Sequence, residues 1–167
     1  MRILGIDPGF ERLGVAVLEK NKGEAQERVI FSECFKTPAS LEFPERLARL
    51  GEETRRVIKK YRPDILAIET LFLSVNQKTA MRVAEARGVI IYESASAGLR
   101  IFEASPLEIK MAITSYGKAD KKQVLKMVKM LVAMDASKKS DDEMDAVAVA
   151  LTAFTRYPQF YRKSLAK

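Results

Sequence analysis

Short runs of branched apolar residues alternate along this chain with longer stretches in which apolar residues recur at helical spacing. The short runs predict β-strands, because each is stopped by a turn residue or a charged side chain. We expect these strands at residues 2–7, 13–19, 28–35, 65–69 and 100–103. The stretches with a period of 3.6 predict helices at residues 43–61, 76–97, 106–114, 121–134 and 141–155.

The order of these elements favours one α/β domain. Three strands follow one another directly, and helices and strands alternate after them, which indicates a mixed five-stranded sheet flanked by helices. This order matches the ribonuclease-H-like (RNase-H-like) arrangement. No internal repeat, low-complexity stretch or long linker divides the 167 residues. We therefore expect a single domain over residues 1–167, with a flexible tail from about residue 157.

The charge of the chain indicates a polyanionic partner. Its formal net charge is +7, and residues 105–139 hold eight lysines against three acids. Within that segment Lys122, Lys126 and Lys129 share one helical face, which could bind phosphate groups or simply face solvent.

Two further features of the composition narrow the chemistry. The chain has no histidine, which excludes histidine-based acid–base catalysis and histidine–metal sites. Cys34 is the single cysteine, so no internal disulfide can form, and we interpret it as a small buried apolar residue. A lone cysteine, no signal-peptide pattern and no long apolar stretch predict a cytoplasmic protein.

Four acids are the candidate catalytic residues. Asp7 and Glu69 each end a buried strand, where α/β sheets place their ligand sites. Asp142 and Asp145 lie three residues apart at the start of the last helix, so they share one face of it. The apolar run after Asp145 predicts packing against the sheet, which would carry both aspartates toward Asp7 and Glu69.

Such a cluster predicts a metal site. Clustered carboxylates repel one another unless a positive charge lies between them. Oxygen ligands without histidine or clustered cysteine favour a hard cation, Mg²⁺ or Mn²⁺, and two such ions can activate water and stabilise the leaving oxygen of a phosphodiester. Each acid also has a structural alternative: Asp142 as a helix cap or first-turn acid, and Asp7 as a turn former.

Several motifs resemble the RuvC family of Holliday-junction resolvases. They are GIDPG at residues 5–9, AIE at 67–69, ARG at 86–88, GKADKKQV at 117–124 and DxxDAVAVAL at 142–151. The resemblance implies a homodimeric Mg²⁺-dependent endonuclease that makes paired nicks in four-way DNA junctions during recombination and repair. It also implies a branch-migration motor, RuvA and RuvB, as partner.

The resemblance assigns roles to individual residues. It implies that Asp7, Glu69, Asp142 and Asp145 are the catalytic, metal-binding acids. Phe72 matches an aromatic residue that engages bases, with a core anchor as the alternative, and Lys110 and Lys121 match lysines that contact DNA. We add Lys122 as a DNA-binding candidate from the basic face. The helix from Asn76 carries the small residues Ala80, Ala84 and Gly88. The resemblance implies that this helix lies at the dimer interface; the alternative is that these residues only pack on the sheet. Where relatives carry a histidine near the last acids, this chain has Glu143 and Met144.

Three alternatives stay open at this point. GIDPG also resembles the first phosphate loop of sugar kinases and actin-like ATPases, but no second glycine-rich loop follows residue 76. A small RNase-H-like nuclease of ribosomal RNA processing begins with a similar strand. A junction-binding protein without catalysis should tolerate the loss of Glu69.

Overall fold

The computed structural model describes residues 1–71, 77–135 and 139–164, and for residues 77–78 and 157–164 it describes the backbone only. Its strands are β1 (Arg2–Asp7), β2 (Arg12–Glu19), β3 (Arg28–Lys36), β4 (Ile65–Glu69) and β5 (Arg100–Ala104). Its helices are α1 (Phe43–Tyr61), α2 (Gln77–Ser96), α3 (Pro106–Thr114), α4 (Lys121–Leu131) and α5 (Asp141–Ser164). Among the described helices, none has the length and apolar character needed to cross a bilayer.

The strands form one mixed sheet in the order β3-β2-β1-β4-β5. The β1–β2 and β2–β3 pairs are antiparallel, and the β1–β4 and β4–β5 pairs are parallel. This confirms the predicted mixed five-stranded sheet. The parallel pairing of β1 with β4 sets Ile6 opposite Ile68, so both strands end at the same edge of the sheet.

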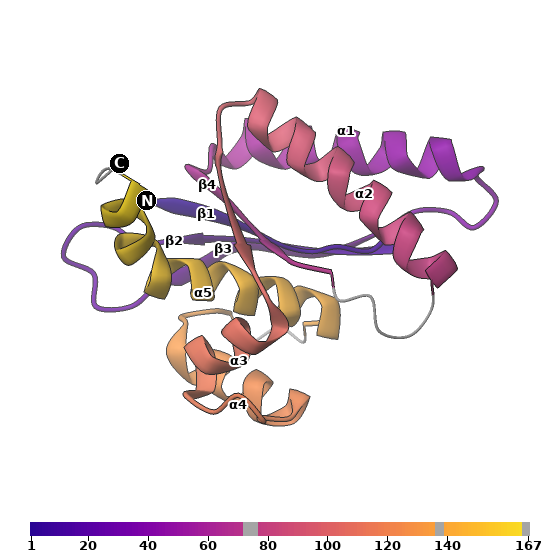
Figure 1. Ribbon diagram of the computed structural model, residues 1–167. Helices are drawn as coiled ribbons and strands as arrows, with labels where there is room; N and C mark the ends of the chain where they lie inside the picture. Colours follow the sequence, from indigo (N-terminus) through magenta and orange to yellow (C-terminus); the bar gives the residue numbers. More distant parts are fainter. Residues whose placement is uncertain (72–76, 136–138, 165–167) are drawn as a thin grey trace.

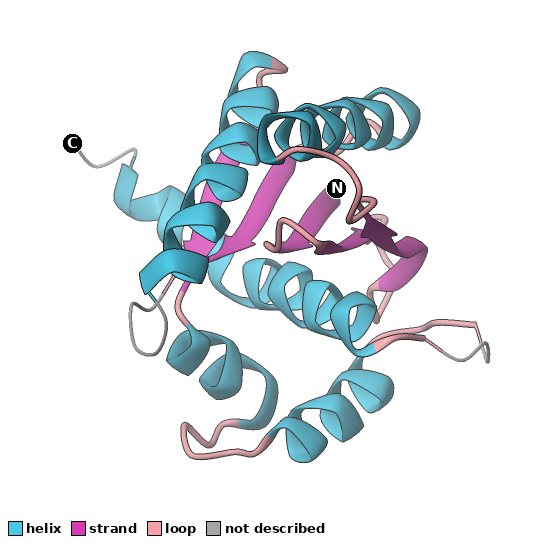
Figure 2. Cartoon of the chain, turned by 90° about the vertical axis from the view of Figure 1, so that its right-hand side faces the viewer, coloured by secondary structure: helices cyan, strands magenta, loops and turns pink. Residues whose placement is uncertain are grey.

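Helices cover both faces of the sheet (Figures 1 and 2). The α1 and α2 helices pack on one face, over a core that includes Leu4 and Ile6. The α5 helix crosses the other face, with α3 and α4 beyond it, over a core that includes Ile3 and Ala16. Ile3 and Leu4 point to opposite faces because strand side chains alternate, which is why β1 reads as a continuous apolar run.

Two helices differ from the prediction at their C-terminal ends. The predicted helix at residues 121–134 stops at Leu131, because Val132 is extended and the backbone then pairs with β3: the Val29 amide donates to the Ala133 carbonyl at 2.8 Å. Leu131, the last residue of the helix, is exposed, whereas Val124 and Val128 are buried. The α5 helix continues to Ser164, beyond the predicted end at residue 155. The flexible tail from about residue 157 stays a prediction.

Capping boxes fix the starts of α3 and α4. The Ser105 side chain accepts from the Glu108 amide, and the Glu108 carboxylate accepts from the Ser105 amide. Asp120 and Gln123 form the same reciprocal pair at the start of α4. The second box makes Lys121 the first residue of its helix, so its position relative to the sheet is well defined.

A close contact between α5 and β1 yields a stability prediction. A Cβ atom on Gly5 would overlap the Ala146 carbonyl oxygen and lie 2.7 Å from the Ala150 Cβ. We expect Gly5→Ala to lower the free energy of unfolding by about 3 kcal/mol, because neither the helix backbone nor the strand can give way. Denaturant unfolding of the metal-free protein measures this change.

Gly117→Ala is the matched control. The Cβ added there would also meet an atom at 2.7 Å, but that atom is the end of the exposed Leu107 side chain, which can rotate away. Its effect should stay within about 0.5 kcal/mol. Equal losses in the two variants would contradict the rigid contact between α5 and β1.

Candidate functional site

The four predicted acids lie on three elements that meet at one edge of the sheet. Asp7 ends β1 and Glu69 ends β4, and the parallel pairing of these strands brings the two carboxylates to the same edge. Asp142 and Asp145 lie in the first turns of α5. The sequence prediction that these acids share one edge is thus met in the fold.

Glycine permits the approach of α5 to this edge. Gly14 on β2 lies opposite Asp7 in the β1–β2 register. A Cβ atom on Gly14 would overlap the Asp142 carbonyl oxygen and lie 3.1 Å from the Asp7 Cβ. The start of α5 and the end of β1 are therefore in direct proximity, and a larger residue at position 14 would separate them.

Asp142 does not cap α5. The Glu143 amide donates to the Ser140 hydroxyl at 3.3 Å, and the Ser140 amide donates to the Glu143 carboxylate at 2.8 Å. This reciprocal pair makes Ser140 the capping residue. A second bond from the Ser32 hydroxyl, at 2.7 Å, ties Glu143 to β3. The capping alternative for Asp142 is excluded, and its carboxylate is available for other contacts.

Burial and mutual repulsion change the acidity of the two strand-end acids. Burial, followed by the charges of Asp145 and Asp142, raises the pKa of Asp7 to about 6. Burial, followed by the charges of Asp7 and Asp145, raises the pKa of Glu69 to about 7. Burial is the larger cause of both shifts, and the repulsion that adds to it indicates that the basic neighbours do not fully offset the negative charge at this edge.

Basic neighbours hold the two helix acids. The Arg12 guanidinium pairs with the Asp142 carboxylate, its Nε donating at 3.0 Å, and the Cys34 thiol lies 3.4 Å from the same oxygen. The guanidinium and thiol bonds outweigh the burial that opposes them, so the pKa of Asp142 is lowered. Lys121 donates to Asp145 at 2.9 Å and lies 3.4 Å from Asp141.

Arg12 and Cys34 were not predicted as site residues. Cys34 is half-buried beside Asp142, so its interpretation as a merely buried apolar residue is wrong. Arg12 begins β2, which returns antiparallel from the end of β1, and a basic residue at that point of the hairpin was the available signal. Its partner comes 130 residues later in the chain, which is why sequence pattern alone does not reveal the pair.

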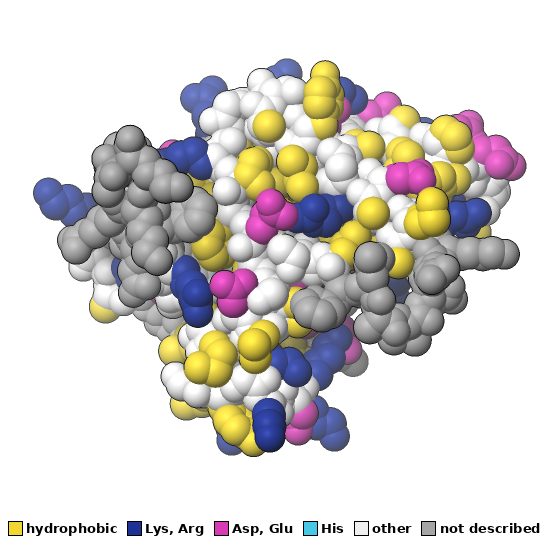
Figure 3. Space-filling view, viewed as in Figure 1, with side chains coloured by type: hydrophobic (Ala, Val, Ile, Leu, Met, Phe, Trp, Pro, Cys, Tyr) yellow, Lys and Arg dark blue, Asp and Glu magenta, His cyan; other side chains and the backbone are white. Residues whose placement is uncertain are grey.

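A cavity of about 230 Å³ adjoins the acids and contains two of the predicted lysines. Lys110 and Lys121 line it together with Glu69 and Asp145. Lys122 is exposed on α4 and is not part of its lining. Phe72 lies outside the described residues. On the face seen in Figure 3, lysine and arginine side chains lie at several points of the lobe formed by α3 and α4, beside hydrophobic side chains.

The donor set suits a hard divalent cation, although its side chains do not converge. Within the described ranges, no three acidic or cysteine side chains lie close enough together to hold a metal ion. Asp142 and Asp145 turn instead toward Arg12 and Lys121. Carboxylate oxygens are nevertheless the ligands that Mg²⁺ prefers, and the raised pKa values of Asp7 and Glu69 mark a deficit of positive charge. By donor chemistry the four acids fit such an ion.

Known proteins resemble this chain in sequence and in fold. Residues 3–153 match the family described as crossover junction endodeoxyribonuclease RuvC. The protein of that name from Caldicellulosiruptor saccharolyticus is 45% identical over 90% of each chain. The one from Thermosipho melanesiensis is 45% identical over 94% of this chain and 100% of the relative.

Solved structures agree with the sequence match. Thermus thermophilus RuvC superposes with a TM-score of 0.86 at 28% identity, covering 96% of this chain and 97% of that one. The same protein in complex with a Holliday junction substrate gives 0.86 at 29% identity, over 95% and 96% of the two chains. The predicted ribonuclease-H-like fold is confirmed by these superpositions. The chain belongs to the RuvC family of crossover junction endodeoxyribonucleases.

Proposed function

We propose that this endonuclease is a homodimeric, Mg²⁺-dependent Holliday junction resolvase that makes paired, symmetric nicks in four-way DNA junctions. The observation that carries the proposal is the cluster of Asp7, Glu69, Asp142 and Asp145 at one sheet edge, where negative charge is incompletely neutralised. A solved structure of a relative with the same fold is a complex with a Holliday junction substrate. We further propose that the reaction serves homologous recombination and DNA repair and that the protein acts in the cytoplasm.

In this proposal the four acids hold two Mg²⁺ ions, for which Mn²⁺ can substitute. When bound, the ions supply activation of water and stabilisation of the leaving oxygen. Asp7 lies close enough to Glu69 and Asp145 for their charges to interact, so it would hold the metal together with both acids. Arg12 would release Asp142, and Lys121 would release Asp145. The freed Lys121 ammonium, together with Lys110, lies along the same cavity and can neutralise the phosphate that is cleaved.

The dimer is proposed from the exposed face of α2. Tyr92 is 69% exposed, and Ala84 and Gly88, which precede it at helical spacing, are exposed as well. A Cβ atom on Gly88 would meet nothing within 4 Å, so simple packing on the sheet does not explain these small residues. A second copy packed on this stripe would set two active sites in two-fold symmetry, matching a four-way junction. RuvA and RuvB are the proposed partners.

Cleavage of a labelled four-way junction tests the activity. We expect Mg²⁺-dependent paired nicks in the junction and none in a linear duplex of the same sequence. Asp7→Asn should reduce the cleavage rate by about 1000-fold or more, because it removes charge from the metal-binding cluster, while junction binding persists. Gel analysis of cleavage, with binding measured in parallel, separates the two effects.

Glu52→Gln, on the exposed surface of α1, is the matched control and should cleave as the wild type does. Cleavage of RNA in place of the junction would support the ribosomal RNA alternative. Hydrolysis of ATP without DNA cleavage would support the ATPase alternative. Junction binding without cleavage by the wild type would support a purely binding role.

The raised pKa of Glu69 predicts a pH-dependent stability. The pKa is about 7 in the fold against an ordinary 4.5, so ionising Glu69 destabilises the fold progressively as pH rises from 4.5 to 7. Glu69→Gln should therefore stabilise the metal-free protein by about 2 kcal/mol at pH 8 and by nothing at pH 4. Thermal unfolding across this range measures the difference, and Mg²⁺ should stabilise the wild type more than the variant.

The same series with Glu52→Gln provides the baseline for replacing an exposed glutamate. A gain in stability for Glu69→Gln that is equal at pH 4 and pH 8 would contradict a buried, repelled carboxylate.

Ala84→Glu tests the dimer. A charge placed in the centre of the apolar stripe should convert the dimer to a monomer, because it would be desolvated against a second copy. Sedimentation measures the mass, and the junction assay should then give single, uncoupled nicks. Ala25→Glu, an exposed alanine between β2 and β3, should leave the dimer intact. A dimer that survives Ala84→Glu would place the interface elsewhere.

A further inference from the structure

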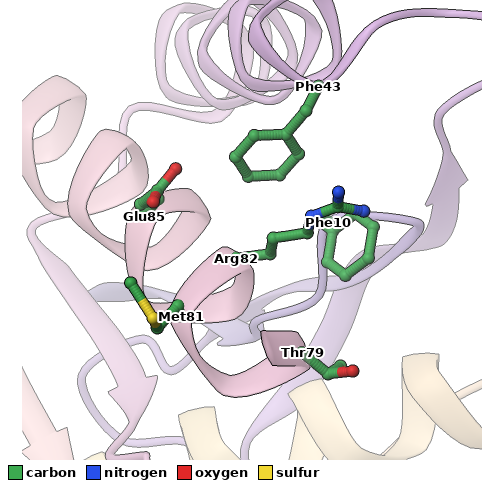
Figure 4. Close-up of a pocket in the computed structure, with 6 residues that line it drawn as sticks. All are labelled: Phe10, Phe43, Thr79, Met81, Arg82 and Glu85. Carbon is green, nitrogen blue, oxygen red and sulfur yellow. The ribbon is translucent and has the colours of Figure 1, made fainter. Parts of the chain in front are cut away.

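A larger cavity, of about 420 Å³, lies on the other side of the sheet from α5. It opens between the loop after β1, the start of α1 and the first half of α2 (Figure 4). Its lining residues are Phe10, Phe43, Thr79, Met81, Arg82 and Glu85. None of these residues belongs to the carboxylate cluster or to the lysine-lined cavity beside it.

Arg82 is held in this cavity by aromatic rings. Its guanidinium carbon lies 5.7 Å from the centre of the Phe10 ring and 5.2 Å from that of Phe43. The two rings pack edge to face, with their centres 5.6 Å apart. In Figure 4 the Arg82 side chain extends from α2 toward both rings. Attraction of the positive charge to the faces of both rings holds the guanidinium between them, and its N–H groups can still donate hydrogen bonds.

A neighbouring arginine differs from Arg82 in having its own partners. Arg46 lies 5.9 Å from the Phe10 ring, is buried, donates to the Leu41 carbonyl at 3.2 Å and pairs with Glu11 at 3.7 Å. Arg82 is exposed and has no acidic partner among the described side chains. Of the two guanidinium groups at Phe10, Arg82 is thus the one with N–H donors left for an anion.

The two charged residues of the lining lie in different parts of the cavity. Glu85 lies one helical turn after Arg82, and in Figure 4 its carboxylate points to a different part of the cavity. An anion is favoured at the Arg82 end and repelled at the Glu85 end. In Figure 4 the Phe43 ring lies between the Glu85 carboxylate and the Arg82 guanidinium. Met81 adds apolar surface below Glu85. A phosphate joined to a flat base, with N–H groups on its edge, matches this order of donor, apolar wall and acceptor.

The loop that carries Phe10 also joins this cavity to the carboxylate cluster. Phe10 follows Asp7 by three residues, and Arg12, the partner of Asp142, follows Phe10 by two. The Thr37 hydroxyl donates to the Phe10 carbonyl at 2.6 Å and fixes the loop. A DNA strand that leaves the carboxylate cluster over this loop would reach the second cavity.

We propose that this cavity binds one nucleotide of the junction, outside the cleavage site, with its phosphate on Arg82 and its base between Phe43 and Glu85. The inference rests on the proposed function, because it assigns a second contact to the same DNA substrate.

The test measures binding of a four-way junction to full-length protein carrying Asp7→Asn, over a series of salt concentrations. Adding Arg82→Gln should weaken binding about tenfold and reduce the slope of log affinity against log salt by about one unit, as expected when one phosphate contact is lost. Arg82→Lys should keep the slope, because it keeps the charge, yet bind more weakly, because an ammonium lacks the planar, paired donors of a guanidinium.

Lys59→Gln is the charge-matched control. Lys59 is exposed near the far end of α1, about 24 Å along the helix from Phe43. It should change neither the affinity nor the slope appreciably. Equal losses of junction affinity in Lys59→Gln and Arg82→Gln would overturn the proposal, because Arg82 would then contribute only as one of many surface charges.

Two other outcomes would also overturn the proposal. Unchanged junction binding by Arg82→Gln would exclude a phosphate contact. Dissociation of the dimer by Arg82→Gln, measured by sedimentation, would mean that a second copy of the chain covers the cavity. Cleavage of the junction by the protein with Asp7 intact is measured alongside, so a failure of the resolvase function itself is recognised separately.

Discussion

The rest of the structure depends on the close packing of α5 against β1 and β2. Gly5 and Gly14 lack the Cβ atoms that would overlap carbonyl groups of this helix. The contact buries the apolar face of α5 and at the same time sets the positions of Asp142 and Asp145. One packing constraint thus determines both the core on this face and the assembly of the carboxylates.

Because that packing brings like charges close together, it has an energetic cost: the carboxylates repel one another. The fold brings four acids together and balances two of them with Arg12 and Lys121. Asp7 and Glu69 have no such partner in the described part of the chain, and their pKa values are raised. RuvC-family nucleases are metal-dependent, and in the proposed function these acids would hold the metal. The metal-free fold is less stable because they lie close together.

The sequence pattern predicted the strands and the position of two of the acids, because these depend on local periodicity and on where strands end. The strands were predicted to within a residue or two, and the edge shared by Asp7 and Glu69 followed from two apolar runs that end in acids. The end of α4 was missed because it is set by pairing with β3, a contact across 105 positions that no local window contains. Arg12 was missed for the same reason. The cavity at Arg82 is built from three separate segments, so no local pattern in the sequence brings its aromatic residues together.

The bridge between Arg28 and Ala133 also affects a different property of the molecule. The β3 strand is an edge strand of the sheet. The unpaired backbone N–H and C=O groups of an edge strand can pair with a strand from another chain. Here the start of β3 is already hydrogen-bonded on its outer side, to the segment that follows α4. Further along the same strand come the charged Glu33 and Lys36. The turn that ends α4 early therefore also protects the outer edge of β3 against pairing with other chains, and so against aggregation.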